Sequence, residues 1–310
     1  MTQPAATGSL RDNSDRICRF RPVTGGGFRA AIEVTRRCRL HCPHCFVPPQ
    51  PLDLSLTSIR WLAAELKREG CRKVILTGGE PLLCADLEEM VRAVTEAGIG
   101  VDLNSSLAGL AAGRAGTLAE AGLKEASVSF YGDREFHDAF VRRQGCYDAA
   151  RSACFALRAF GVDVDVHGPL WVENLRHAAH LCELAEQIGA SSLTFFKIVK
   201  SPHATGRSWQ ARYAEPAESA FAGLLDEMRL HTSIPIRSVG FRRSAGEACE
   251  QACSIVGIDA ALRLTPCLLS RSLYRDPAVI RRGALGEALR LLREEVRRGD
   301  WQPWCGQDVP

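Results

Sequence analysis

Long hydrophobic runs are missing from this 310-residue sequence. No apolar stretch reaches the roughly 18 residues that a membrane-spanning helix needs, and residues 1–16 lack the continuous apolar segment of a secretory signal. Lysine is scarce, with five among the 39 basic residues, and a net charge of +3 gives no basic stripe of the kind that binds nucleic acid. We therefore expect a cytoplasmic protein with neither a membrane nor a nucleic-acid partner.

Cysteine, by contrast, is abundant. The chain has 13 cysteines, an odd number, and several stand singly inside amphipathic helical patterns. This usage favours a reducing compartment over a disulfide framework. The remaining composition, 46% hydrophobic and 24% charged, is close to the globular average and excludes disorder, collagen-like repeats and coiled coil.

Short β-branched runs alternate with helical periodicity through the larger part of the chain. The helix expected after the first run carries Ile59, Leu62, Ala63 and Leu66 at the i, i+3, i+4 and i+7 positions of one face. Six strands are predicted, at residues 30–34, 74–77, 101–104, 126–130, 162–166 and 193–196. Repeated strand–helix units imply a parallel sheet with right-handed crossovers. The sequence therefore predicts an α/β fold, a partial (β/α)6 barrel.

The pattern changes after residue 235. Residues 255–269 alternate like a pair of strands, and residues 284–298 read as a closing helix. We expect three parts: an N-terminal tail at 1–27, the barrel at 28–235 and a small C-terminal module at 236–310.

Three closely spaced cysteines follow the first predicted strand. Cys38, Cys42 and Cys45 form a Cys-x3-Cys-x2-Cys run. Three thiolates in one loop can ligate three irons of a 4Fe-4S cube and leave the fourth iron open. A structural zinc site, completed by His41 or His44, is the alternative that this run alone leaves open.

The second strand ends in Gly78, Gly79, Glu80 and Pro81. Two glycines let the backbone approach a ligand closely, and the carboxylate of Glu80 can accept a hydrogen bond from an ammonium group. These residues are candidates for binding a cofactor.

Further polar residues follow the next strands. Asn104 at the end of the third strand and Ser129 in the fourth can hold ribose hydroxyls, and Arg142 and Arg143 can bind a carboxylate. All of these positions map to the carboxyl ends of strands, where barrel enzymes build their sites.

With these residues the chain resembles radical S-adenosylmethionine (radical SAM) enzymes. The matching positions are the three cysteines, residues 78–81, 128–132 and 137–145. The resemblance implies that SAM binds the open iron of the 4Fe-4S cluster, and that an electron from a flavodoxin or ferredoxin splits it to a 5′-deoxyadenosyl radical. Two residues depart from the family pattern: Tyr131, where relatives often have Asp, and His44, where an aromatic residue often lies against adenine.

The C-terminal cysteines have a wider spacing. Cys253, Cys267 and Cys305 resemble the ligands of an auxiliary 4Fe-4S cluster in a twitch-type module. The fourth ligand is open between Cys249, Asp308 and a bound substrate, and buried or zinc-binding thiols are the alternative.

Acidic residues alternate with apolar ones along several predicted strands, so one face of the sheet is expected to be wet. The carboxylates concerned are Glu33, Asp102, Asp163 and Asp165. They either form salt bridges to arginines or to Lys197, or they bind a hydroxylated, cationic substrate such as an aminosugar.

The chain is also similar to twitch-type radical SAM epimerases that act on aminoglycosides, in the manner of neomycin C to neomycin B. That similarity implies hydrogen abstraction from a sugar carbon and return of hydrogen from the thiol of Cys249 on the opposite face. The alternatives are an aminosugar or aminocyclitol dehydrogenase that uses the auxiliary cluster as electron acceptor, a peptide-modifying radical SAM enzyme, and a non-catalytic metal-binding scaffold.

Overall fold

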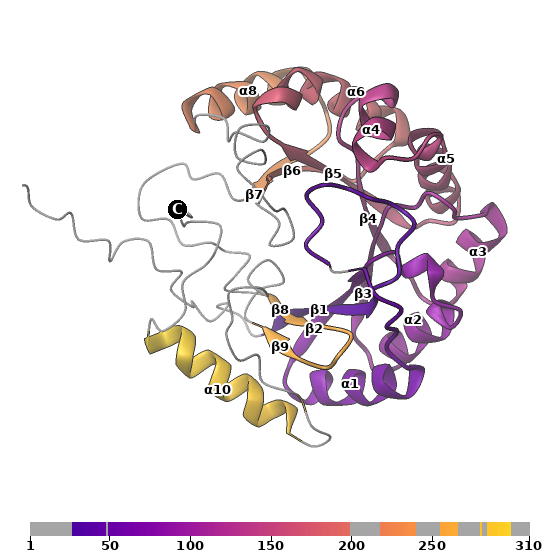
Figure 1. Cartoon of the computed structure of the whole chain (residues 1–310), viewed down its shortest axis with the longest axis vertical. Coiled ribbons are helices and arrows are strands. Elements are labelled where there is room, and N and C mark those ends of the chain that lie inside the picture. The colour runs from indigo at the N-terminus through magenta and orange to yellow at the C-terminus, as the bar shows by residue number, and fades with distance from the viewer. Residues whose placement is uncertain are drawn as a thin grey trace, which may run out of the picture.

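The structure, a computed structural model, describes residues 27–47, 49–198, 218–239, 255–265, 280 and 284–298. These residues form one nine-stranded sheet in the order β7-β6-β5-β4-β3-β2-β1-β8-β9. The sheet is curved, and its helices lie along the outer side of the curve (Figure 1). This arrangement confirms the predicted α/β fold with a parallel sheet.

The strands are β1 (Phe28–Thr35), β2 (Cys71–Gly78), β3 (Gly100–Ser105), β4 (Glu125–Ser129), β5 (Asp163–Leu170), β6 (Ser192–Lys197), β7 (Ile236–Val239), β8 (Ile255–Ile258) and β9 (Leu264–Thr265). The α-helices are α1 (Leu56–Arg68), α2 (Leu87–Glu96), α3 (Ala112–Glu120), α4 (Arg134–Val141), α5 (Cys146–Ala159), α6 (Ala178–Ile188), α8 (Glu218–His231) and α10 (Leu285–Arg298), and the 3-10 helices are η2 (Pro81–Leu83) and η3 (Val172–His177). In the part of the chain that the structure describes, no helix combines the length and hydrophobicity that a membrane crossing requires.

Strands β1 to β7 pair in parallel in chain order, and β8 pairs in parallel with β1 on its other side. Parallel strands all end at the same edge of a sheet, so the loops that follow β1, β2, β3 and β4 gather there. The predicted cofactor-binding residues that follow β1 and β2, which are Cys38, Cys42, Cys45 and residues 78–81, therefore lie at this edge.

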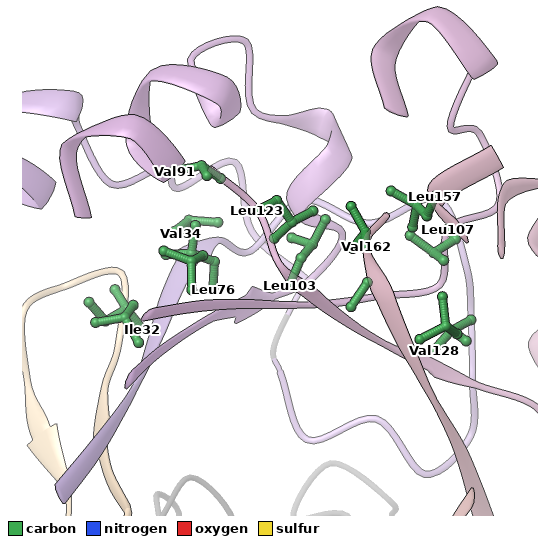
Figure 2. Close-up of a cluster of buried hydrophobic side chains, with 14 of the residues drawn as sticks. Ile32, Val34, Leu76, Val91, Leu103, Leu107, Leu123, Val128, Leu157 and Val162 are labelled. Carbon is green, nitrogen blue, oxygen red and sulfur yellow. The ribbon is translucent and has the colours of Figure 1, made fainter. Parts of the chain in front are cut away.

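The hydrophobic core lies between the sheet and the helices. Ile32, Leu76 and Leu103 are fully buried on the outer face of the strands, and Figure 2 shows them in one cluster beneath helices α2 and α5. Helix α1 begins at Ser55, whose side chain accepts a hydrogen bond from the N–H of Ser58 at 3.1 Å. Its apolar stripe faces the same core.

The inner face of the strands is polar. Asp102, Ser127, Asp165 and Thr194 lie on the opposite side of their strands from the core residues, and the parallel register places Ser127 opposite Asp165 and Thr194 opposite His167. The alternation in the sequence correctly predicts these two faces.

The residues after 235 extend the sheet at both edges. The predicted strand pair is the antiparallel β8–β9 hairpin, and the predicted closing helix is α10, which contacts β9 and α1. Because β7 pairs with β6 and β8 with β1, the sheet is continuous across residue 235. The domain boundary at that residue stays a prediction, and most of the expected tail at 1–27 lies outside the described residues.

Candidate functional site

The cysteine loop (residues 36–47) leaves the carboxyl end of β1. Its Cys38, Cys42 and Cys45 are partly exposed thiols. The N–H of Cys45 donates to the carbonyl of Cys42 at 3.1 Å, and the N–H of His41 donates to the carbonyl of Val141 at 3.1 Å. The loop, indigo in Figure 1, is thereby tied to the end of α4. Three thiols consequently share one anchored loop at the carboxyl edge of the sheet.

The chemistry of the three thiols fits an iron–sulfur cluster. Burial raises the pKa of Cys38 and Cys42, and the other sulfurs of the loop raise the pKa of Cys42 further. Without a metal centre these thiols keep their protons at pH 7, and the positive charge of a bound metal centre displaces them. Among the described residues, no group of three His, Cys, Asp or Glu side chains is arranged to hold a single metal ion. The three thiols supply the ligands for three irons of a 4Fe-4S cluster and leave the fourth iron open.

Gly78 and Gly79 bring the second loop against the cysteine loop. The N–H of Gly79 donates to the carbonyl of Thr35, and the N–H of Glu80 donates to the carbonyl of Arg37, both at 2.7 Å. A Cβ atom at Gly78 would lie 2.2 Å from the oxygen of Thr35, and one at Gly79 would lie 2.2 Å from the oxygen of Arg37. The sequence led us to expect a ligand here, whereas the backbone that these glycines approach is that of the last residue of β1 and of the start of the cysteine loop.

Glu80 is buried and fully hydrogen-bonded. Its carboxylate accepts from the hydroxyl and N–H of Ser106, the hydroxyl of Ser105 and the N–H of Leu82. A carboxylate offers about four acceptor sites, so an incoming ammonium group must displace a donor. The oxygens of the two serine hydroxyls also accept hydrogen bonds from the N–H groups of Leu107 at 2.9 Å and Ala108 at 3.3 Å.

The two residues that depart from the family pattern lie against each other. The hydroxyl of Tyr131 and the Nε2 of His44 are 3.3 Å apart, although the residues are 87 positions apart in the chain. Phe140 packs on both rings. Burial lowers the pKa of His44 to about 4, so its ring is neutral at pH 7, and its buried Nδ1 has no hydrogen-bond partner in the described part of the chain. This aromatic contact fixes the cysteine loop to the end of β4.

The other four residues predicted to bind the cofactor differ in how exposed they are. Asn104 and Ser129 are partly buried and lie on the polar face near the carboxyl edge of the sheet, as predicted. Arg142 and Arg143 are exposed at the end of α4, where Arg142 adopts a left-handed conformation with a φ of 58°. Their contact with a cofactor carboxylate stays a prediction.

Two of the four predicted substrate carboxylates are held by arginines. Glu33 is 0% exposed, lies 3.4 Å from Nε of Arg36 and accepts from the N–H of Ala260 at 3.1 Å. Asp163 stands at the amino end of β5, is 61% exposed and binds Arg158 at 2.7 Å. These positions favour the salt-bridge alternative for both residues.

The other two carboxylates have no cationic partner of this kind. Asp102 accepts from the hydroxyl of Ser127 at 3.0 Å, while Asp165 accepts from the hydroxyl of Thr194 at 3.0 Å and lies 3.3 Å from Nε2 of His167. Within the described ranges, neither forms a salt bridge with an arginine or a lysine, although the charges of Arg29 and Lys73 act on Asp102. Burial raises the pKa of Asp102. Burial also acts to raise the pKa of Asp165, but hydrogen bonds from His167 and the hydroxyls outweigh it and lower that pKa.

The sequence did not single out Ser127 and Thr194. Both stand on the polar side of their strands, directly opposite Asp165 or His167 in the register. The alternation of each strand marks them, but their partners become evident only once the strands are aligned.

The C-terminal candidates cannot be located in this way. Cys249, Cys253, Cys267, Cys305 and Asp308 all lie outside the described residues. The auxiliary cluster and its ligands therefore stay predictions.

Comparison with known proteins identifies the class. The family model of the Radical SAM superfamily matches residues 32–185. The crystal structure of Streptococcus suis SuiB superposes with a TM-score of 0.72, covering 88% of this chain and 68% of that one at 12% identity, which shows the fold alone. The chain belongs to the radical SAM superfamily.

Curated relatives narrow the comparison without fixing a reaction. The AdoMet-dependent heme synthase of Oleidesulfovibrio alaskensis is 29% identical over 213 residues, covering 67% of this chain and 55% of that protein. The GTP 3′,8-cyclase of Rhodococcus opacus is 26% identical over 303 residues, covering 90% and 84%. The chain spans about half the length of the heme and coproporphyrin synthases that it matches.

Proposed function

We propose that this protein is a radical SAM enzyme that holds a 4Fe-4S cluster on Cys38, Cys42 and Cys45. The observation that carries the proposal is that residues 79 and 80 hold the end of β1 and the start of the three-thiol loop by two backbone hydrogen bonds of 2.7 Å, to the carbonyls of Thr35 and Arg37. When bound, the cluster supplies the electron that splits SAM and so gives the enzyme a carbon radical able to remove hydrogen from a substrate. A flavodoxin- or ferredoxin-type protein is the proposed source of that electron.

The protein's own residues bind and orient the SAM molecule. Glu80 accepts a hydrogen bond from its ammonium group once the hydroxyls of Ser105 and Ser106 turn away. Asn104 and Ser129 offer an amide and a hydroxyl to the ribose. Arg142 supplies a guanidinium to the carboxylate from the end of α4.

The polar face of the sheet supports a cationic substrate. Asp102 and Asp165 are partly buried carboxylates whose described partners are hydroxyls and one imidazole. Burying a carboxylate costs several kcal/mol unless a positively charged group pairs with it. A substrate with amino and hydroxyl groups supplies both the charge and the hydrogen-bond donors, as an aminoglycoside does.

For the reaction we propose epimerisation at a sugar carbon, with the thiol of Cys249 returning a hydrogen atom to the face opposite the one that lost it. The thiyl radical left on Cys249 returns to the thiol by taking one electron from the flavodoxin- or ferredoxin-type donor and one proton from water. The support is the resemblance of the cysteine spacing to aminoglycoside epimerases together with the open carboxylates on the inner face. Dehydrogenation through an auxiliary cluster on Cys253, Cys267 and Cys305 and modification of a peptide are the competing outcomes.

One experiment separates these outcomes. The anaerobically reconstituted protein is incubated with SAM, dithionite and a panel of aminoglycosides, neomycin C among them, in deuterated water, and products are analysed by mass spectrometry. Epimerisation gives an isomer that carries one deuteron from solvent. Dehydrogenation gives a product two mass units lighter without solvent deuterium, and it would replace the epimerase proposal.

A variant tests the proposed hydrogen donor. Cys249→Ala is expected to form 5′-deoxyadenosine yet yield little inverted product, because only the return of hydrogen is lost. Inversion at the rate of the unmodified protein would exclude Cys249 as the donor. A chain that loads a cluster and never cleaves SAM would contradict the proposed function altogether.

A further inference from the structure

A buried ion network joins the start of the cysteine loop to the turn of the β8–β9 hairpin. Arg36, 5% exposed, binds Asp259 through Nη2 at 2.9 Å and lies 3.4 Å from Glu33 through Nε. Asp259 is 1% exposed and also binds the side chain of Arg263, with Nη2 at 2.6 Å. Two guanidinium groups and two carboxylates balance in charge, although Arg36 and Asp259 are 223 positions apart in the chain.

On the barrel side, Arg36 closes the base of the cysteine loop. Its N–H donates to the carbonyl of Leu52 at 2.8 Å, and its carbonyl accepts from the N–H of Gln50 at 3.4 Å. Its Nη1 donates to Oε1 of Gln50 at 3.1 Å. Arg36 thus fixes both the start of the loop, two residues before Cys38, and the segment in which the chain returns.

On the hairpin side, Asp259 organises the turn. Its Oδ1 accepts from the N–H groups of Ala261 at 3.0 Å and Arg263 at 2.9 Å. The N–H of Ala260 donates to Glu33 of β1 at 3.1 Å. The turn is therefore held by this hydrogen bond to the Glu33 side chain of β1 as well as by the ion pair between Arg36 and Asp259.

The orientation of the cysteine loop depends on this support. Cys38 follows Arg36 by two residues, and the intervening carbonyl of Arg37 is the acceptor for the N–H of Glu80. A guanidinium that lost its buried carboxylate would turn toward water and move the segment that carries this acceptor. Residues that contact the ligands of a metal site orient those ligands and so affect the affinity of the site.

We propose that Asp259 is a positioning residue for the SAM site: through Arg36 it holds the base of the cysteine loop in register with Glu80. The hairpin that carries Asp259 is flanked in the sequence by Cys253 and Cys267, so this turn links the segment with the C-terminal cysteines to the cysteine loop. The proposal rests on the proposed function only in taking the cysteine loop as the cluster site.

The test uses Asp259→Asn in the full chain, which keeps the oxygen that caps the turn and removes the charge. In the protein without cluster, amide hydrogen exchange of residues 37–46 is expected to speed up at least tenfold, while exchange in β4 is unchanged. In the reconstituted protein, SAM is expected to bind at least tenfold more weakly, measured by equilibrium dialysis with labelled SAM. Asp226→Asn, which removes an exposed ion pair on α8, is the matched control and should leave both values within twofold.

A merely structural role for Asp259 predicts a different result. The melting temperature would then fall while loop exchange and SAM affinity stayed within twofold at 20 °C below melting, and this result would overturn the proposal. If the Asn variant does not fold, Asp259→Glu decides, because it keeps the charge and displaces it by one methylene group. The Glu variant should bind SAM at least threefold more weakly, and unmodified affinity would overturn the proposal.

The two measurements, hydrogen exchange without a cluster and SAM binding by the reconstituted protein, distinguish a failure of this proposal from a failure of the proposed function. Hydrogen exchange is measured without a cluster, so it tests the support of the loop even if the unmodified protein holds no iron. Failure of the unmodified protein to bind SAM would contradict the proposed function, and unchanged loop exchange in Asp259→Asn would contradict the role of Asp259.

Discussion

The molecule contains two sets of carboxylates, one buried and one partly buried, which differ in the groups that they contact. Glu33 and Asp259 lie 0% and 1% exposed, and both face the guanidinium of Arg36. Asp102 and Asp165 lie on the same polar face of the sheet and are held by hydroxyls and an imidazole. The first set (the closed set) forms salt bridges with arginines, whereas in the part of the chain described the second set (the open set) forms none with an arginine or a lysine.

We interpret the first set, Glu33 and Asp259, as residues that stabilise the fold, and the second set, Asp102 and Asp165, as candidates for binding a ligand. A buried carboxylate with a guanidinium partner stabilises its surroundings only as long as the pair stays intact. Asp102 has no such partner and its pKa is raised by burial, so its ionised form is held at a cost in stability, and such costs concentrate at functional sites. Sequence reasoning put Glu33, Asp102 and Asp165 in one group, and only their partners distinguish them.

The largest expected effect is on the closed set. Glu33→Gln should lower the free energy of unfolding by about 3 kcal/mol, because Arg36 then keeps one buried carboxylate where it had two. Urea unfolding measures this. Asp163→Asn, which removes an exposed pair with Arg158, should cost less than about 1 kcal/mol. Equal losses in the two variants would remove the distinction between buried and exposed pairs.

The next effect is on substrate binding by the open set. Asp165→Asn should raise the KM for the aminated substrate about tenfold or more, since a charge-assisted hydrogen bond contributes about 1.5–3 kcal/mol. SAM cleavage in the absence of substrate should not change. Steady-state kinetics beside Asp163→Asn provides the comparison, and identical KM values would argue against a cation at Asp165.

A smaller effect is expected on stability, with the sign reversed. Asp102→Asn should raise the free energy of unfolding by about 0.5–2 kcal/mol, the usual gain when a strained functional residue is relaxed. Burial raises the pKa of Asp102, so its ionised form is unfavourable in the folded state. Thermal unfolding at pH 7 measures the gain, and a clear loss of stability would assign Asp102 to the closed set.

The smallest effect is the pH dependence that separates the two open carboxylates. The pKa of Asp165 is lowered in the fold, so its stabilising contribution is complete above the ordinary Asp pKa of about 3.9 and disappears as pH falls through the folded pKa. The pKa of Asp102 is raised, so its destabilising contribution is absent below about 3.9 and develops as pH rises toward the folded pKa.

Urea unfolding of Asp165→Asn and Asp102→Asn between pH 3.5 and 7 therefore should give differences from the unmodified protein of opposite sign. Both differences should shrink toward the acid end of this range. Curves that change in the same direction would show that the two carboxylates share one environment.

Local features of the sequence predict strands β1 to β6 and the edge of the sheet at which the cysteine loop lies, but they did not predict β7. Valines that alternate with acids in β5 predict a strand with one dry and one wet face, and the structure buries Val164 and Val166 completely. The run of three cysteines directly after β1 predicts a loop at the carboxyl edge, because loops that follow parallel strands meet there.

Partners distant in the chain were beyond the reach of such patterns. Nothing near Arg36 in the sequence indicates Asp259, and nothing near His44 indicates Tyr131. The sequence predicts that Gly78 and Gly79 approach a ligand, whereas the close approach in the structure is to the backbone of Thr35 and Arg37 and depends on how β1 and β2 are aligned. Register and tertiary contact decide these points, and a period-2 pattern contains neither.

The most direct test concerns the three thiols themselves. Unmodified protein, Cys42→Ala and Cys154→Ala, the last a fully buried thiol in α5, are reconstituted anaerobically and incubated with SAM and dithionite. We predict 5′-deoxyadenosine from the unmodified protein and from Cys154→Ala, and none from Cys42→Ala. Equal formation by Cys42→Ala, or zinc bound in place of iron in the unmodified protein, would contradict the account.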